Sequence, residues 1–394
     1  MAGKQKITKS SELSSCDSYF ENVQCRKKVP FSLQQTLTAA FAEIPASSFP
    51  PVPGGKVIEI LEDTSVADAV RILSERNIMA APVKKVDAGN SSDWRDRYLG
   101  IIDYSAIVLW AAAGIGTGAV GALGAVALGV IGPVAVAGLT AAAVGGGVAA
   151  EKGAGKDAST AADNLGQDFY KVLLQEEPFK STTVGSIVKS YRWSPFLPVV
   201  TNSSMLSILL LLSKYRLRNV PVIEPGNPDI QNFITQSAIV QGLEGCKGRD
   251  WFDCIAAHPI SNVGLPFVSA DERGPNKKIV GNLSIRDIRY LLLKPELFSS
   301  FRQHTVMDFM NTVVSTTEGT GRVTPPITCK PDATLGSLVH ALASKSVHRI
   351  HVVNQSEEVV GVITLRDVIS CFVYEPPNHF DNYFSFSTKE MLND

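Results

Sequence analysis

Motifs for catalysis and for metal binding are missing from the 394-residue sequence. It contains neither a GxSxG nucleophile motif nor a P-loop lysine motif. Its six cysteines form no CxxC pair, and histidines do not cluster beside them, which argues against a zinc site. We therefore expect a non-enzymatic protein with no catalytic residue, no metal and no cofactor, and we interpret the cysteines as thiols in a reducing compartment.

An excess of charge of either sign is also lacking. Lys and Arg number 37 and Asp and Glu number 38, so charge provides no general attraction to nucleic acid or to an anionic membrane. The polar first fifteen residues lack the apolar core of a secretory signal. These absences predict an intracellular soluble protein, cytoplasmic or nuclear, that binds no nucleic acid and has a flexible N-terminal region over residues 1–54.

Charged residues are absent from the whole of 104–150, which is mostly Gly and Ala after residue 110. Its length and its small residues at four-residue spacing would suit a membrane hairpin. Frequent Gly, sparse Leu, Ile and Phe, and the lack of a flanking basic cluster argue against one. We interpret 111–165 as a low-complexity insert and keep a membrane-attached regulator as an alternative.

What the sequence does contain is an internal repeat. Each copy opens with Asp or Asn and a short hydroxyl-bearing or small turn, which is typical of a helix N-cap. Apolar residues at helical spacing and a short strand follow. The three gap-free copies of this half are 63–84, 202–223 and 332–353.

A second strand that runs into a second helix completes each copy, so the repeated unit is β-α-β-β-α. The copies of this second half are 98–109, 232–243, 279–292 and 359–370. The third lacks a first half, because Pro259 would break the helix there and 269–278 leads directly into the second strand. A natural shortened form and an incorrectly joined chain both fit this gap.

The repeats predict an α+β fold and a division of the chain. A three-stranded sheet with helices on one side leaves an apolar face that pairing of repeats buries, which predicts two modules, 55–243 and 244–375. The predicted segments are the N-terminal region 1–54, repeat 1 at 55–110, the insert 111–165, repeat 2 at 184–243, a truncated repeat 3 at 244–295, repeat 4 at 305–375 and a tail at 376–394. The aromatic-rich tail would dock on the protein itself or on a partner.

The repeats resemble the cystathionine-beta-synthase (CBS) domain. The residues that carry the resemblance are IMAAPVKK in repeat 1, VPVIEP in repeat 2, and VHRIHVV and VVGVITLRDVI in repeat 4. Four such copies in order resemble the gamma regulatory subunit of the AMP-activated and sucrose-non-fermenting-related protein kinases. The Gly/Ala insert in the first module resembles the plant type of this subunit.

That resemblance implies a non-catalytic subunit of a heterotrimeric, energy-sensing serine/threonine kinase. It would bind AMP, ADP or ATP as regulatory ligands in clefts between paired repeats. Its partners would be a catalytic alpha-type subunit and a beta-type scaffold. In the family, the acid of the second helix holds ribose and the basic residues before the strand hold phosphate.

Two segments have the S/T-x-x-D form that suits both a ribose site and a helix cap: Ser284 to Asp287 and Thr364 to Asp367. A carboxylate accepts two hydrogen bonds, and vicinal ribose hydroxyls offer two donors. A capping box uses the same residues without a ligand. The equivalent cap positions in repeats 1 and 2 are Asp103 and Thr235, which are followed by alanine where the acid would stand.

Basic residues stand before the strands of repeats 2 and 4. His348 and Arg349 align with Arg218 and its neighbour, and they suit phosphate oxygens, although a solvated pair at a strand start would also explain them. The resemblance implies a weakened site that joins Asp287 to His348 and Arg349. The site of Asp367 would be mostly lost, because its basic residues belong to the missing half of repeat 3. A structural scaffold that no longer senses nucleotides is the main alternative.

Overall fold

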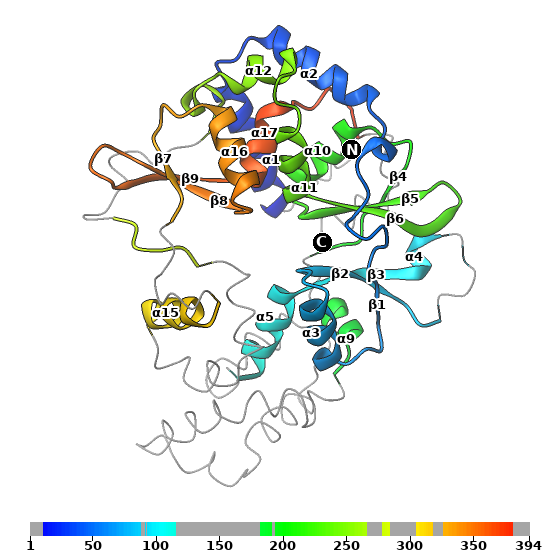
Figure 1. The fold of residues 1–394 in the computed structure, drawn as a ribbon. Coiled ribbons are helices and arrows are strands. Elements are labelled where there is room, and N and C mark those ends of the chain that lie inside the picture. The colour runs from blue at the N-terminus through cyan, green and yellow to red at the C-terminus, as the bar shows by residue number, and fades with distance from the viewer. Residues whose placement is uncertain are drawn as a thin grey trace, which may run out of the picture. The chain divides into compact units, whose positions relative to one another are not determined.

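The computed structural model describes most of the chain outside the Gly/Ala insert and the two ends (Figure 1). The described residues are 11–87, 91, 93–115, 182–190, 194–265, 278–283, 305–317 and 326–380. The chain divides into two compact units, which we treat separately. Unit 1 comprises 1–57, 197–280 and 326–394, and unit 2 comprises 58–196 and 281–325.

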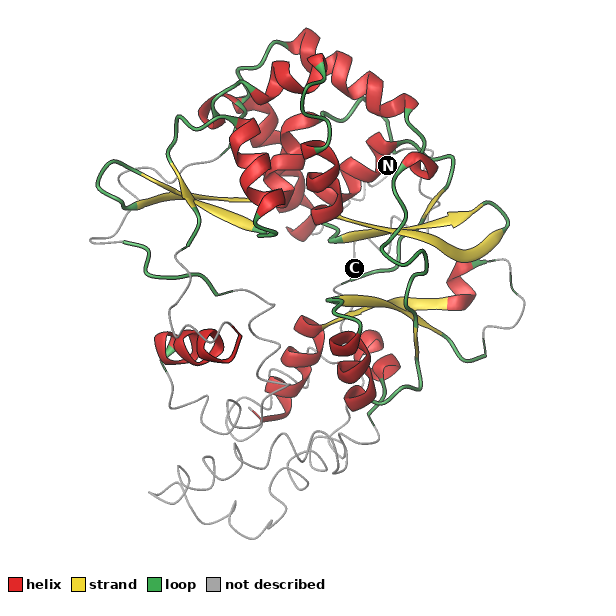
Figure 2. Ribbon diagram, in the orientation of Figure 1, coloured by secondary structure: helices red, strands yellow, loops and turns green. Residues whose placement is uncertain are grey.

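The described part of unit 2 contains repeat 1 and the helices α9 (Val184–Ser190) and α15 (Val306–Thr317), and Figure 2 shows the helices in red and the strands in yellow. The elements of the repeat are β1 (Ile60–Leu61), α3 (Val66–Glu75), β2 (Ala80–Lys84), α4 (Trp94–Arg97), β3 (Tyr98–Asp103) and α5 (Tyr104–Ile115). The hydroxyl of Ser65 caps α3 by accepting a hydrogen bond from the backbone of Asp68.

Unit 1 contains repeats 2 and 4. Repeat 2 consists of β4 (Val199–Val200), α10 (Met205–Ser213), β5 (Asn219–Glu224), β6 (Asn227–Thr235) and α11 (Gln236–Glu244). Repeat 4 consists of β7 (Thr328–Cys329), α16 (Leu335–Ser344), β8 (Arg349–Val353), β9 (Val359–Thr364) and α17 (Leu365–Phe372). The other elements of the unit are α1 (Ser11–Arg26), α2 (Phe31–Glu43), η1 (Ala46–Ser48), α12 (Asp250–Ala256) and η3 (Ile260–Asn262).

The three sheets have one topology, which confirms the predicted α+β fold and the β-α-β-β-α unit in repeats 1, 2 and 4. Their strand orders are β1-β2-β3, β4-β5-β6 and β7-β8-β9. In each sheet the central strand pairs parallel with the first strand and antiparallel with the third. The central strand always comes from the first half of a repeat, so the second half depends on the first half for its hydrogen bonds.

Repeat 3 shows what happens to a second half without its first half. The sequence predicts a strand at the start of 279–292, and this prediction is wrong for the described residues 279–283. Residues 279–283 form no strand, and Val280 is 70% exposed. Only a single bridge, between Lys278 and Glu358, joins this segment to repeat 4 in the described residues. The first half that would supply a central strand is missing from the sequence, so the second strand has no ladder to join.

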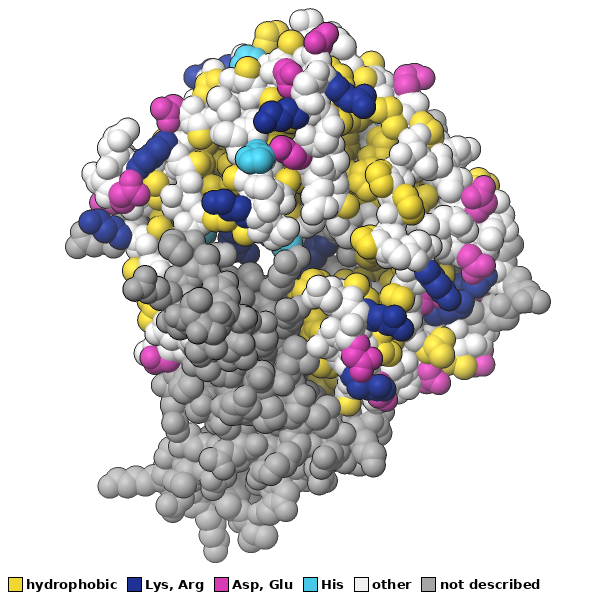
Figure 3. All heavy atoms as spheres, in the orientation of Figure 1, with side chains coloured by type: hydrophobic (Ala, Val, Ile, Leu, Met, Phe, Trp, Pro, Cys, Tyr) yellow, Lys and Arg dark blue, Asp and Glu magenta, His cyan; other side chains and the backbone are white. Residues whose placement is uncertain are grey.

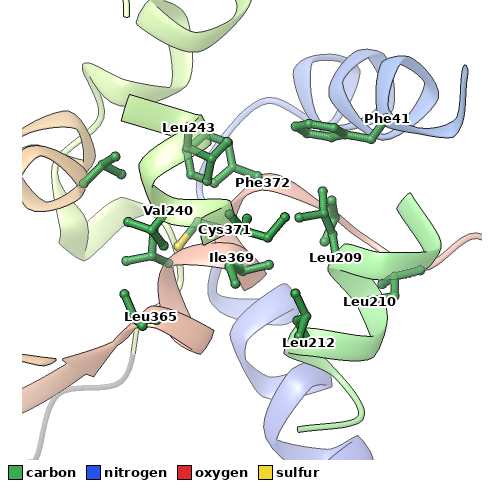
Figure 4. Close-up of a cluster of buried hydrophobic side chains, with 14 of the residues drawn as sticks. Phe41, Leu209, Leu210, Leu212, Val240, Leu243, Leu365, Ile369, Cys371 and Phe372 are labelled. Atoms are coloured by element: carbon green, nitrogen blue, oxygen red, sulfur yellow. The ribbon is translucent and has the colours of Figure 1, made fainter. Parts of the chain in front are cut away.

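The core of unit 1 is shared between repeats 2 and 4. Helices α10 and α11 pack on α16 and α17, and Figure 4 shows Leu209, Val240 and Ile369 side by side among buried side chains. The predicted pairing of repeats did not include this helix-to-helix contact. The pairing of repeats 1 and 2 through their sheets stays a prediction, because it concerns the placement of the two units.

Part of the N-terminal region 1–54, which the sequence predicts to be flexible, is packed in the structure. Helices α1 and α2 pack on repeats 2 and 4, where Phe20 is 3% exposed and Leu37 is 1% exposed. Apolar residues at four-residue spacing, Leu33, Leu37 and Phe41, give α2 a face that the core buries. That spacing is readable in the sequence and would have predicted this helix.

Three segments that precede or follow repeats attach to another repeat in the same way. Each forms one bridge with the residue that caps the repeat's first helix, and two backbone hydrogen bonds flank that bridge. The bridges are Pro45 with Ser204, Thr183 with Ser65, and Pro259 with Thr334. Segments at the start of repeats 2 and 3 therefore pack on repeats 1 and 4, and the segment before repeat 1 packs on repeat 2.

The first part of the predicted tail docks on the protein itself. Phe380 is 5% exposed and contacts Tyr215 edge to face, with ring centroids 5.2 Å apart. His379 lies 3.2 Å from the hydroxyl of Ser207. Residues 381–394 lie outside the described residues, as does the insert from residue 116 to residue 165.

The described surface carries charges of both signs. On the face in Figure 3, basic and acidic side chains are interspersed, which agrees with the near balance of charges in the sequence. Among the described helices, none combines the length and the apolar character that crossing a membrane requires.

Candidate functional site

The second helices of the three described repeats all begin with a side-chain cap, as the sequence predicts. Asp103 accepts a hydrogen bond from the backbone of Ala106 at 2.8 Å in repeat 1. Thr235 accepts one from Ala238 at 3.1 Å in repeat 2. Thr364 caps α17 in repeat 4, so this position of the fold always holds an oxygen acceptor.

The cap of α17 is the predicted capping box. One carboxylate oxygen of Asp367 accepts hydrogen bonds from the Thr364 backbone at 2.8 Å and from the Thr364 hydroxyl at 2.7 Å. The other oxygen accepts a hydrogen bond from the hydroxyl of Tyr19. Asp367 is 5% exposed, so three protein donors surround a nearly buried carboxylate.

The basic residues lie where the sequence places them, at the start of central strands beside second helices. The carbonyl of Arg218 accepts a hydrogen bond from the backbone of Gln236, the first residue of α11, at 3.2 Å. The carbonyl of His348 accepts the equivalent bond from Leu365, the first residue of α17, also at 3.2 Å. Arg349 lies directly opposite Thr364 in the antiparallel ladder.

One contact brings repeats 2 and 4 together at this end of the sheets. Nε2 of His348 lies 3.2 Å from the hydroxyl of Ser237, in the first turn of α11. The side chains of Arg218, His348 and Arg349 are exposed. A basic side chain of repeat 4 therefore stands beside the N-terminus of a helix of repeat 2, where backbone N–H groups favour an anion.

His351 lies two residues further along the same strand. It is half-buried, and its Nδ1 is buried without a hydrogen-bond partner. Burial lowers the pKa of His351, and the charge of Arg349 lowers it further. The imidazole is therefore neutral near pH 7 and packs as a strand residue.

Two predicted site residues, Ser284 and Asp287, lie outside the described residues. Two residues contact the predicted site residues although the sequence did not point to them. Ser237 contacts His348, and Tyr19 contacts Asp367. Ser237 occupies the turn after a predicted cap, so an aligned view of repeats 2 and 4 could have drawn attention to it. Tyr19 is distant in sequence from Asp367, and no local pattern points to that contact.

The repeated sheets and capped helices, with basic residues at the strand starts, define a protein built from CBS repeats. A family model, described as the CBS domain, matches residues 322–374, which contain most of repeat 4. A solved archaeal structure, described as a putative homologue of the gamma subunit of AMPK from Methanocaldococcus jannaschii, is 15% identical. It covers 82% of this chain and 100% of its own, with a TM-score of 0.45.

Two relatives from Arabidopsis thaliana are described as SNF1-related protein kinase regulatory subunits. The one named gamma-1-like is 58% identical over 446 positions and covers 100% of both chains. The one named gamma-1 is 33% identical over 398 positions, covering 92% of this chain and 90% of its own. The chain belongs to the gamma regulatory subunits of SNF1-related protein kinases, a non-catalytic family.

The first of these alignments runs over 446 positions, whereas this chain has 394 residues, so the difference of 52 positions consists of gaps in this chain.

Proposed function

We propose that this regulatory subunit binds an adenine nucleotide in unit 1, at the end of the sheets where Arg218, His348 and Arg349 stand. The approach of His348 to Ser237 supports the proposal most, because it combines a basic side chain of one repeat with the helix N-terminus of another. Imidazole, guanidinium and backbone N–H groups are donors that suit phosphate oxygens. AMP, ADP and ATP all carry phosphate oxygens that can accept hydrogen bonds from these donors.

The ribose partners in the proposal are the two acids of the S/T-x-x-D segments. Asp367 and its cap Thr364 lie in the same repeat as Arg349, and Thr364 pairs with Arg349 in the antiparallel ladder. Asp287 and Ser284 would supply the equivalent groups from repeat 3. Vicinal hydroxyls donate to a carboxylate in the way that the hydroxyl of Tyr19 already does.

Calorimetric titration of the full chain with AMP, ADP and ATP tests the proposal. Replacing one charge-assisted phosphate contact by Arg349→Ala should weaken binding about tenfold or more. Arg71→Ala is the matched control, since Arg71 is an exposed arginine of α3 that pairs with Asp68. Equal binding heats in the wild type and in Arg349→Ala would contradict the assignment.

The family membership also supports a partner proposal. We expect the chain to assemble with a catalytic alpha-type kinase subunit and a beta-type scaffold. Nucleotide occupancy would then change the arrangement of the repeats, and the bound kinase would respond to that change. Affinity purification from cell extract should recover the catalytic subunit, and recovery of the chain as a monomer would contradict this expectation.

A scaffold without nucleotide sensing is the second candidate, and the lack of a strand at 279–283 favours it. A ligand that binds only the folded chain stabilises it, so a measurement of stability with and without AMP distinguishes nucleotide sensing from a scaffold function. A ligand at 100 times its dissociation constant raises the free energy of unfolding by about 2.7 kcal/mol. A rise in the melting temperature of the full chain with saturating AMP supports sensing, and an unchanged melting temperature supports the scaffold.

A further inference from the structure

Tyr19 occupies the side of Asp367 that the capping box leaves open. Its hydroxyl donates to the carboxylate oxygen that Thr364 does not contact. The guanidinium carbon of Arg366 lies 4.6 Å from the centroid of the Tyr19 ring, a cation–π distance. Burial and the neighbouring Asp367 charge raise the pKa of Tyr19, so the phenol stays protonated and donates.

Further contacts fix helix α1 along α17. Nε2 of Gln24 donates to the carbonyl of Ser370 at 3.3 Å. Nζ of Lys27, directly after α1, donates to the carbonyl of Val373 at 3.0 Å. Phe20 and Val23 are 3% and 1% exposed, so the same helix also contributes to the core. The Tyr19 contact is therefore part of a docked helix.

We infer that helix α1 competes with a hydroxyl-bearing ligand for Asp367. A phenol hydroxyl and a ribose hydroxyl make the same charge-assisted hydrogen bond to a carboxylate. With Thr364 on one oxygen and Tyr19 on the other, a vicinal diol gains access to Asp367 only when Tyr19 moves away. This inference rests on the proposed function and adds to it a regulated site, in which the docking of α1 and the binding of ribose exclude each other.

The test removes the competing hydroxyl and keeps the ring, by Tyr19→Phe in the full chain. AMP affinity should rise about tenfold, the change expected for the loss of one charge-assisted hydrogen bond. The gain should disappear in the double variant Tyr19→Phe with Asp367→Asn. Tyr374→Phe is the matched control, because Tyr374 packs against Phe31 with ring centroids 5.6 Å apart and should leave affinity unchanged.

Hydrogen exchange provides a second readout on the wild-type chain. Saturating AMP should increase amide exchange in residues 19–26 of α1, because the nucleotide displaces Tyr19. Unchanged AMP affinity in Tyr19→Phe, together with unchanged exchange in α1, would overturn the inference. If Arg349→Ala still weakened binding in that case, the proposed nucleotide site would stand. Absence of AMP binding in every variant would overturn both.

Discussion

Helices α11 and α17 occupy equivalent places in repeats 2 and 4, and only the first turn of α17 carries an acid at the third position after the cap. Both are capped by a threonine, Thr235 or Thr364, whose hydroxyl accepts a backbone hydrogen bond. The third position after the cap is Ala238 in α11 and Asp367 in α17. The alanine leaves the first turn of α11 without an acid, whereas Asp367 binds both its own cap and Tyr19.

This difference shows which residues the helix needs in order to form and which are available for a binding site. The cap alone suffices to start α11, so the acid in α17 adds interactions that the helix does not need. One oxygen of that acid holds the cap, and the other holds a hydroxyl from a distant helix. Repeat 2 instead presents a helix start that meets His348 of the neighbouring repeat. We interpret the two first turns as complementary halves of a nucleotide site.

The largest expected effect follows from Asp367→Ala. It removes half of the capping box and leaves the part-buried hydroxyl of Tyr19 without its acceptor, so the free energy of unfolding should fall by about 2 kcal/mol. Thr235→Ala removes only a cap and should cost about 1 kcal/mol. Urea denaturation followed by circular dichroism measures both. Equal costs would show that the acid contributes no more than a cap.

A smaller effect should appear with pH, on the α17 side alone. Burial lowers the pKa of Lys27 from 10.5 to about 8, so between these values the unfolded chain binds a proton that the folded chain has released. Lys27 should therefore contribute a rise of about 1 kcal/mol in the unfolding free energy from pH 8 to pH 9, measured as the difference between the wild type and Lys27→Met. Below pH 8 both states bind the proton and this contribution is constant.

Three thiols act in the opposite direction within the same range, because burial raises the pKa of Cys246, Cys329 and Cys371 above the unfolded value of 9.0. As the pH approaches 9, the unfolded chain loses thiol protons that the folded chain keeps. Urea denaturation at pH 8.0, 8.5 and 9.0 therefore compares the wild type with Lys27→Met, in which the thiol contributions are the same. An equal pH dependence of the unfolding free energy in the two proteins would contradict the assignment to Lys27.

The smallest expected effect belongs to the α11 side. Ser237→Ala removes an exposed hydroxyl that contacts His348, so the free energy of unfolding should change by no more than about 0.5 kcal/mol. AMP affinity measured by calorimetry should nevertheless fall, because the serine helps to hold the imidazole beside the helix start. A large loss of stability without any change in affinity would make Ser237 a structural residue and break the comparison with α17.

Local patterns in the sequence predicted the repeats and their caps. The hydroxyl residues Ser65, Ser204 and Thr334 cap the first helices, two residues after each predicted opening Asp or Asn. Asp103, Thr235 and Thr364 cap the second helices as predicted. These features depend on residues within one turn of each other, which is why they are readable without a structure.

Features that depend on distant residues were not predictable in this way. The contact of Tyr19 with Asp367 and the attachment of segments to other repeats join parts of the chain far apart in sequence. The strand at 279–283 was predicted from a local match, but a strand needs a neighbour, and repeat 3 has lost its central strand.

A crystal structure of the full chain grown with excess AMP tests the central claim most directly. The account predicts a phosphate group within hydrogen-bonding distance of His348 and Arg349, beside the first turn of α11. A nucleotide bound elsewhere, or none bound while His348 remains on Ser237 and Asp367 remains on Tyr19, would contradict it.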